Sequence, residues 1–135
     1  MKSDKELRKC FEVTMDNNGI LCLTFLDEEK DPDGSVRVAE LIKNDALAII
    51  DQDAKKQYKV IVDLAPMGKG GFTNSRARNK YIEISEHKQI TKIGILGGNI
   101  LIRTTVGLIF KAAGKGNAMK WFTNKTKAVK WLGEN

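Results

Sequence analysis

The amino-acid sequence predicts a single α/β domain built on a mixed, mainly parallel sheet of about five strands. Short β-branched runs alternate with segments whose apolar residues recur at helical spacing, and the first two strands have the pattern of a hairpin. No linker, internal repeat or low-complexity tract divides the 135 residues, a length typical of one domain. The expected order of elements is ββαβαβαβα, with four helices. It occupies residues 9–133 and follows an N-terminal tail over residues 1–8.

The two strands of the opening hairpin are expected over residues 11–15 and 21–25, where apolar and polar residues alternate. A three-residue loop with Gly19 in the left-handed conformation would pair Met15 with Leu21. This register places the apolar side chains of both strands on one face, whereas a two-residue turn would set apolar residues against polar ones.

A helix is expected after the acidic turn at residues 27–34, with Ser35 as its N-cap. Its apolar residues recur at helical spacing: Ala39, Ile42, Ala46, Ile49 and Ile50. A buried parallel strand is expected over residues 59–64, because this β-branched run is apolar on both faces. The strand leads through a glycine-rich loop into a helix over about residues 75–86.

The remaining elements continue the alternation of strands and helices. We expect a buried strand over 90–96, a helix over 100–113, a short strand over 118–122 and a last helix capped by Thr123 or Asn124. Trp121 and Trp131 occupy core positions of their elements, which favours packing over the alternative of stacking on nucleic-acid bases.

The composition is that of an ordinary soluble globular protein, with 41% hydrophobic and 30% charged residues. The N-terminus has no apolar run of the kind found in signal peptides, and no apolar stretch approaches the ~20 residues of a membrane span. We therefore expect a cytoplasmic protein. In the hairpin register Cys10 and Cys22 do not face each other, so two buried thiols are expected and no disulfide.

The formal net charge of +6 is concentrated at the C-terminal end. Residues 1–98 are neutral overall, whereas residues 99–135 hold seven basic side chains against Glu134 alone. A one-sided basic surface attracts anionic partners such as an acidic protein, anionic lipid head groups or a phosphate backbone. Of these, an acidic protein is expected more than a nucleic acid. The alternative is that the lysines only keep the outer faces of the last helices solvated.

The junction between the middle strand and the next helix is the leading candidate site, because unpaired backbone N–H groups at a helix start attract anions. Its residues form a candidate anion-binding or partner-binding set: Asp63, Gly68, Lys69, Gly70, Gly71, Thr73, Asn74, Arg76 and Arg78. A phosphate, a phosphoserine or a carboxylate would suit this position. The loop is not a nucleotide-binding P-loop, in which serine or threonine follows the lysine.

No catalytic residues, metal ligands or cofactor are expected. Ser75, His87 and Asp63 suggest a triad, but Ser75 and His87 lie at opposite ends of one predicted helix, about 18 Å apart at the rise of an α-helix. His87 also has no cysteine or histidine neighbour at the spacing of metal ligands.

The helix predicted over residues 100–113 is apolar on two sides. One face can pack on the sheet, while Leu101, Leu108 and Ala112 extend onto another face. We expect these three residues to form a homodimer interface or, as a second choice, to line a cleft for an apolar ligand. The alternative is that the last helix of the chain covers them.

Several segments resemble the STAS fold, in particular its SpoIIAA-like branch. They are the opening hairpin, the strand ending in Val-Asp-Leu at 62–64, the helix start Phe-Thr-Asn-Ser at 72–75 and the closing segment 121–132. In that branch a phenylalanine closes the last strand, and the following helix carries an alanine and ends in Trp-Leu. The resemblance spans about residues 9–133 and implies a partner-binding protein similar to anti-sigma factor antagonists. The branch is also similar in shape to CRAL-TRIO lipid-binding domains.

The resemblance implies a phosphorylation switch, because STAS proteins of this kind carry a phosphorylated serine where this chain has Ser75. Asn74 stands where the family's switch loops have an acid, and Arg76 follows the serine. A phosphate on Ser75 would lie at a positive helix end beside Arg76 and Arg78. The alternative is that Thr73, Asn74 or Ser75 serves only as the N-cap.

Three functional hypotheses follow from the sequence. The first is a non-enzymatic regulatory or protein-interaction module of the STAS kind. The second is a binder of lipid or another small apolar ligand. The third is an enzyme, for which the chain offers no evident acid–base pair and no activated nucleophile.

Overall fold

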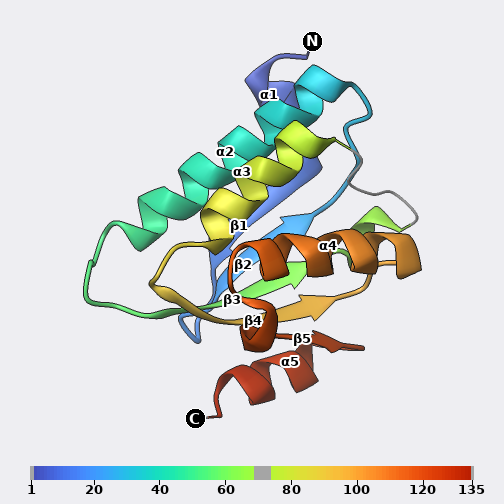
Figure 1. Ribbon diagram of the computed structural model, residues 1–135. Coiled ribbons are helices and arrows are strands. Elements are labelled where there is room, and N and C mark those ends of the chain that lie inside the picture. The colour runs from blue at the N-terminus through green and yellow to red at the C-terminus, as the bar shows by residue number, and fades with distance from the viewer. Residues whose placement is uncertain (1, 69–73, 135) are drawn as a thin grey trace.

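A computed structural model describes residues 2–68 and 74–134 as an α/β fold with one five-stranded mixed sheet (Figure 1). The strands lie in the sheet in sequence order: β1 (Phe11–Met15), β2 (Leu21–Phe25), β3 (Tyr58–Asp63), β4 (Ile90–Leu96) and β5 (Met119–Phe122). β1 is antiparallel to β2, and all other neighbours are parallel. The predicted fold class is confirmed, and from β1 onward the strands and helices follow the predicted order; a fifth helix, over residues 4–7, precedes β1.

The helices cover the two faces of the sheet unequally. Three of them connect successive parallel strands: α2 (Pro32–Ile50), α3 (Ser75–Ser85) and α4 (Ile100–Ala112). Right-handed crossovers between strands in sequential order all pass over the same side, so these helices lie together on one face (Figure 1). α5 (Lys125–Leu132) follows the last strand and packs on the opposite face.

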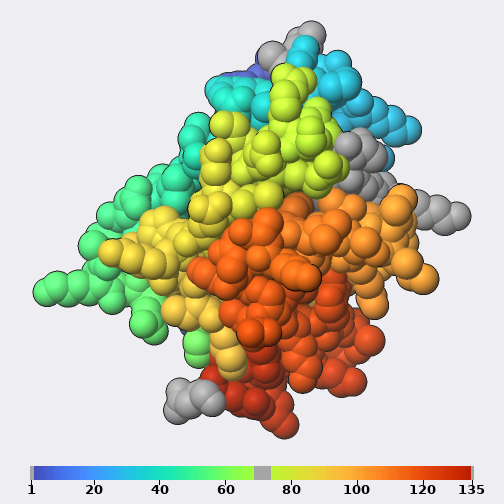
Figure 2. All heavy atoms as spheres, in the orientation of Figure 1, coloured from blue at the N-terminus to red at the C-terminus, as the bar shows by residue number. Residues whose placement is uncertain are grey.

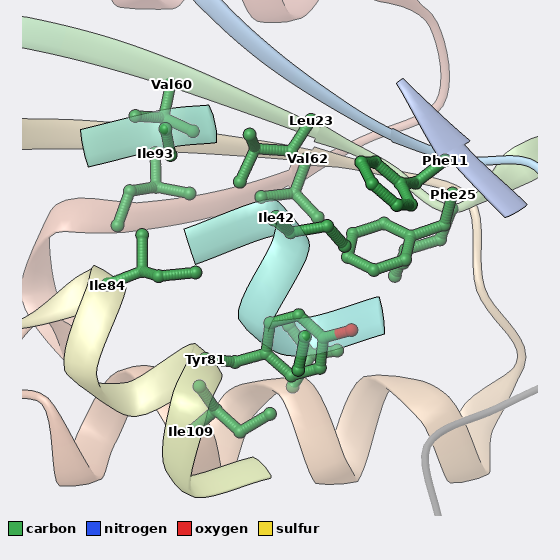
Figure 3. Close-up of a cluster of buried hydrophobic side chains, with 14 of the residues drawn as sticks. Phe11, Leu23, Phe25, Ile42, Val60, Val62, Tyr81, Ile84, Ile93 and Ile109 are labelled. Carbon is green, nitrogen blue, oxygen red and sulfur yellow. The ribbon is translucent and has the colours of Figure 1, made fainter. Parts of the chain in front are cut away.

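Two apolar clusters fill the space on either side of the sheet. The larger cluster lies between the sheet and α2, α3 and α4 (Figure 3), and it includes Val60 and Val62 of β3. The smaller cluster lies beneath α5 and comprises Ile20, Cys22, Ile61, Leu96, Ala128 and Leu132. Because neighbouring side chains of a strand point to opposite faces, Val60 and Ile61 enter different clusters, which explains why β3 is apolar throughout.

The hairpin has the predicted register, with Met15 opposite Leu21. Gly19 has a φ of +76°, the left-handed conformation that glycine adopts most readily. Asp16 Oδ1 accepts hydrogen bonds from two backbone N–H groups of the loop, each at 2.9 Å, and so holds the turn.

Cys10 and Cys22 are both free and buried, as predicted. The residue opposite Cys22 in the hairpin is Thr14. Burial raises the pKa of both thiols, so neither is activated as a nucleophile.

The predicted start of α2 is wrong. The helix begins at Pro32, and its N-cap is Asp31 rather than Ser35, since Asp31 Oδ2 accepts a hydrogen bond from the Gly34 N–H at 2.9 Å. Proline suits the first helical position because its missing N–H has no partner there and its φ is already helical. The acidic turn therefore contains the first turn of the helix.

The N-terminal residues, expected to form a tail, fold against α2. α1 (Asp4–Leu7) is a single helical turn, and the 3-10 turn η1 (Arg8–Cys10) follows it. Leu7 is fully buried in the larger cluster. Two ion pairs tie this segment to α2: Arg37 with Asp4 at 2.9 Å and Arg8 with Asp45 at 2.7 Å.

Candidate functional site

The carboxyl ends of the parallel strands share one edge of the sheet, the usual position of binding sites in α/β proteins. After β3, the 3-10 turn η2 (Ala65–Met67) packs against the turn that precedes α4, where a Cβ atom on Gly97 would lie 2.6 Å from the Ala65 nitrogen. Gly97 also has a φ of +75°, so glycine is required there on both counts. Asp63 Oδ1 accepts a hydrogen bond from the Ala65 N–H at 3.0 Å and holds the start of η2.

Asn74 is the N-cap of α3, a role that the sequence left open between three residues. Its Oδ1 accepts hydrogen bonds from the N–H groups of Arg76 and Ala77, at 2.9 and 3.3 Å. Its Nδ2 donates to the Pro32 carbonyl at 2.8 Å, which joins the starts of α3 and α2. Ser75 is therefore not needed as a cap, and its side chain is exposed at the first position of the helix.

A polar hollow of about 350 Å³ lies between the first turns of α2 and α3. Its lining residues are Glu29, Lys30, Pro32, Ser35, Asn74, Ser75 and Arg76. Arg76 Nη2 donates to Asp33 Oδ1 at 2.9 Å, but both side chains are mostly exposed, so the pair contributes little stability. The hollow thus brings Ser75 together with two cationic side chains, Lys30 and Arg76.

Glu29 is the acidic residue of this hollow, and its side chain is only 7% exposed. Its Oε2 lies 2.9 Å from Lys2 Nζ, and its Oε1 accepts a hydrogen bond from the Asp31 N–H at 3.1 Å. The contact with Lys2 lowers the pKa of the Glu29 carboxyl, which is charged at neutral pH. The sequence did not single out Glu29 or Lys30, because only the packing of α2 beside α3 places their turn next to Ser75.

The other predicted loop residues are only partly accounted for. Lys69, Gly70, Gly71 and Thr73 lie outside the described residues. Gly68 directly follows η2 and is exposed, and Arg78 is half-buried on α3. The predicted residues that the structure brings together at one hollow are Asn74, Ser75 and Arg76.

The triad suggested by the sequence is excluded by the fold. Ser75 begins α3, and His87 lies beyond its last turn, about 18 Å away along the helix. Asp63 ends β3 at the carboxyl edge of the sheet, whereas His87 precedes β4 and lies at the opposite edge. The His87 imidazole instead lies 3.9 Å from Asp51 Oδ1. Within residues 2–68 and 74–134, no three His, Cys, Asp or Glu side chains gather as metal ligands would.

The outer side of α4 holds all the exposed large apolar side chains found among the described residues. These are Ile100, Leu101 and Leu108, which are 85%, 75% and 61% exposed, and Ala112 beside them is also exposed. α4 forms a broad part of the surface beside α3 in Figure 2. α5 packs on the other face of the sheet and does not cover α4, so the alternative in which the last helix shields these residues is wrong. Ile100, the first residue of the helix, was not among the residues predicted for this surface.

The charged residues of α4 are all basic. Arg103 Cζ lies 5.1 Å from the centre of the Trp121 ring, and its Nε donates to the Gly98 carbonyl at 3.2 Å. Lys111 is exposed in the last turn of the helix. The sequence has no acidic residue between positions 97 and 133, so this part of the chain supplies no carboxylate to neutralise them.

Trp121 and Trp131 are half-buried and pack against the larger and the smaller cluster respectively. Lys92 Nζ lies 4.3 Å from the centre of the Trp131 ring and donates to the carbonyls of Trp131 and Glu134, at 2.8 and 3.0 Å. Both rings therefore make contacts within the protein, as the predicted core positions imply.

Two small apolar cavities lie between the sheet, α3 and α4, with volumes of about 40 and 20 Å³. Val106, Ile109 and Phe110 of α4 line the larger one together with Tyr81, Ile84 and Ser85 of α3. A dry cavity of ~150 Å³ is the size that holds benzene, so neither of these two has room for a lipid chain.

No model of a known protein family matches the chain, and a search among curated proteins finds no match. In the part of the chain that the structure describes, no helix is both long enough and apolar enough to cross a membrane.

Proposed function

We propose that the protein is a non-enzymatic interaction module that binds a protein partner through the outer side of α4 and the adjoining carboxyl edge of the sheet. The observation that carries this proposal is the exposure of Ile100, Leu101 and Leu108 on one helix. Large apolar side chains gathered on one exposed surface are typical of partner-binding sites. The resemblance to the SpoIIAA-like branch of STAS domains, which bind protein partners, supports the same function.

Ser75 is the regulatory position in this proposal. It is exposed in the hollow that also contains Lys30 and Arg76, and Asn74 already satisfies two N–H groups of the helix start. A phosphate adds up to two negative charges, which these cations and the helix start would accommodate. Phosphorylation would thereby change the charge of the edge that adjoins α4.

Photo-crosslinking in the cells that make the protein tests the proposed function. A photoreactive phenylalanine derivative at position 108 is expected to trap a defined partner protein, and Leu101→Lys is expected to remove that product. The matched control carries the same derivative at position 127, exposed on α5 on the other side of the sheet. If the derivative at position 108 yields no product beyond that of position 127, the proposed function is wrong.

A further inference from the structure

We propose that the partner contacts α4 with an acidic amphipathic helix, whose apolar side packs on the strip formed by Leu101, Leu108 and Ala112. This inference rests on the proposed function of the α4 surface and adds the chemical class of the partner segment. Recognition of this kind, in which an apolar helix face lies on a complementary surface, uses anchors spaced at i, i+3, i+4 and i+7.

The helical period places the apolar strip along one side of α4. At 100° per residue, Leu101, Leu108 and Ala112 point within about 40° of one another, and the strip extends over about 16 Å. This length matches about three turns of a partner helix. Ile109 lies next to the strip around the axis of α4, and it lines a cavity together with residues of α3. The strip therefore runs along the side of α4 that is nearer to α3. Arg103, which contacts Trp121 of β5, marks the other side.

The charges around the strip select an acidic occupant. Lys111 lies beside it on α4, and no carboxylate of the described residues pairs with Lys111. Arg103 lies on the opposite side of the helix, about 140–180° from the residues of the strip. Lys115 differs, because its Nζ donates to the carbonyls of His87 and Ile90, at 2.8 and 2.6 Å. An exposed lysine that has no carboxylate partner and lies beside an apolar strip is complementary to carboxylates flanking an apolar helix face.

A second copy of the chain fits this surface less well than an acidic helix. A two-fold contact would place the strip of one α4 against the strip of the other, and each helix brings Lys111 beside the strip but no carboxylate. Like charges brought together in an interface are unfavourable.

An anionic bilayer also fits less well. Lys125, Lys127 and Lys130 belong to α5 on the opposite face of the sheet, so a flat membrane in contact with α4 would not reach them. The cations left on α4 are Arg103 and Lys111, each worth about 1 kcal/mol near an anionic surface. That attraction supports only weak binding.

Synthetic peptides test this inference with the purified full-length protein. The probe is a fluorescent, helix-forming peptide of about 16 residues with leucines at i, i+3, i+4 and i+7 and glutamates on the flanks. Its twin has lysine in place of every glutamate. In fluorescence anisotropy we expect the acidic peptide to bind at least about tenfold more tightly than its twin, and increasing salt to weaken it.

Two variants with the same change of charge locate the binding surface. Lys111→Glu is expected to weaken binding of the acidic peptide about tenfold, and the matched control Lys127→Glu less than about twofold. Leu108→Ser is expected to weaken it as well. Circular dichroism verifies the fold of each variant, and all three side chains are exposed.

Each other outcome overturns the acidic-helix assignment. Equal binding of the two peptides, no binding, or equal effects of Lys111→Glu and Lys127→Glu would do so. A wild-type dimer in sedimentation that Leu108→Ser dissociates would assign the strip to a second copy. Flotation with phosphatidylserine vesicles that depends on Leu101 would assign it to a membrane. If crosslinking at position 108 traps a partner but the acidic peptide shows no preference, the proposed function stands and only this inference fails.

Discussion

α2 and α4 have the same structural task, since each connects two parallel strands across the same face of the sheet, yet their outer sides differ. The charged residues of α2 pair within the chain: Arg37 with Asp4, Arg8 with Asp45 and Lys43 with Glu83. α4 has no carboxylate and exposes three large apolar side chains. The outer side of α2 is thus completed by the N-terminal segment and α3, whereas that of α4 is left open.

The difference shows that the buried side chains of a helix stabilise the fold, whereas its exposed apolar side chains can bind a partner. Burying a leucine side chain contributes roughly 1.5–3 kcal/mol, and the isolated protein does not gain this from Leu101 or Leu108. That free energy remains available for binding. The inner sides of both helices, by contrast, enter one common core.

The same substitution in the two helices should have the most unequal effect. Leu41→Ala in α2 removes a buried side chain and is expected to lower the free energy of unfolding by about 2–5 kcal/mol. Leu108→Ala in α4 is expected to change it by less than about 0.5 kcal/mol. Urea denaturation followed by circular dichroism measures both. A loss for Leu108→Ala as large as that for Leu41→Ala would mean that the α4 surface is buried in solution.

A pair of glycines tests how α4 is anchored at the carboxyl edge. Gly97 and Gly114 have nearly equal φ values of +75° and +77°, but only a Cβ at Gly97 meets another atom, 2.6 Å away in the backbone of Ala65. Gly114→Ala is expected to cost about 1–2 kcal/mol for the left-handed conformation alone. Gly97→Ala should cost about 1–3 kcal/mol more, because η2 and the start of α4 must move apart. Thermal unfolding measures both, and equal losses would contradict the close packing of η2.

Lowering the pH should weaken two ion pairs that involve residues of α2. Pairing with Arg37 lowers the pKa of Asp4, and pairing with Lys43 lowers that of Glu83. A carboxyl group whose pKa is lower in the folded state stabilises the fold fully above its unfolded pKa, near 4, and loses this contribution as the pH falls through the folded pKa. The free energy of unfolding should therefore fall with pH in this range.

The double variant Asp4→Asn, Glu83→Gln should show a shallower fall, because two of the groups that take up protons on unfolding are absent. Both side chains are about half exposed, at 50% for Asp4 and 44% for Glu83, so the expected effect on stability is the smallest of the three. Denaturation curves between about pH 5 and about pH 3 measure it. Identical slopes for the variant and the wild type would show that these pairs do not contribute in solution.

Much of the fold was predictable because its signals are local. Alternation around Gly19 predicted the register of Met15 with Leu21, and the bounds of β4 agree with those expected. The residues around the start of α2 did not determine where that helix begins. Asp31, Pro32 and Ser35 all favour a helix start, and the choice depends on which side chain reaches an N–H group once the chain has folded.

The candidate site was predictable only in part. The exposed serine and the basic residues after Asn74 follow from the βα junction, but Glu29 and Lys30 come from a turn more than 40 residues earlier in the chain. Leu101 and Leu108 were recognised as a second apolar side of the helix. Their exposure depends on where α5 packs, which no feature of the helix itself determines.

Residues near one another along the chain were thus sufficient to specify the strands, the helices and the hairpin, because periodicity and turn geometry are local properties. The side of the sheet that each helix covers is not a local property. It follows from the order of the strands and the hand of the crossovers, which place α2, α3 and α4 on one face and leave the other to α5. This arrangement leaves the apolar strip of α4 exposed, and packing across the whole domain brings Glu29 to Ser75.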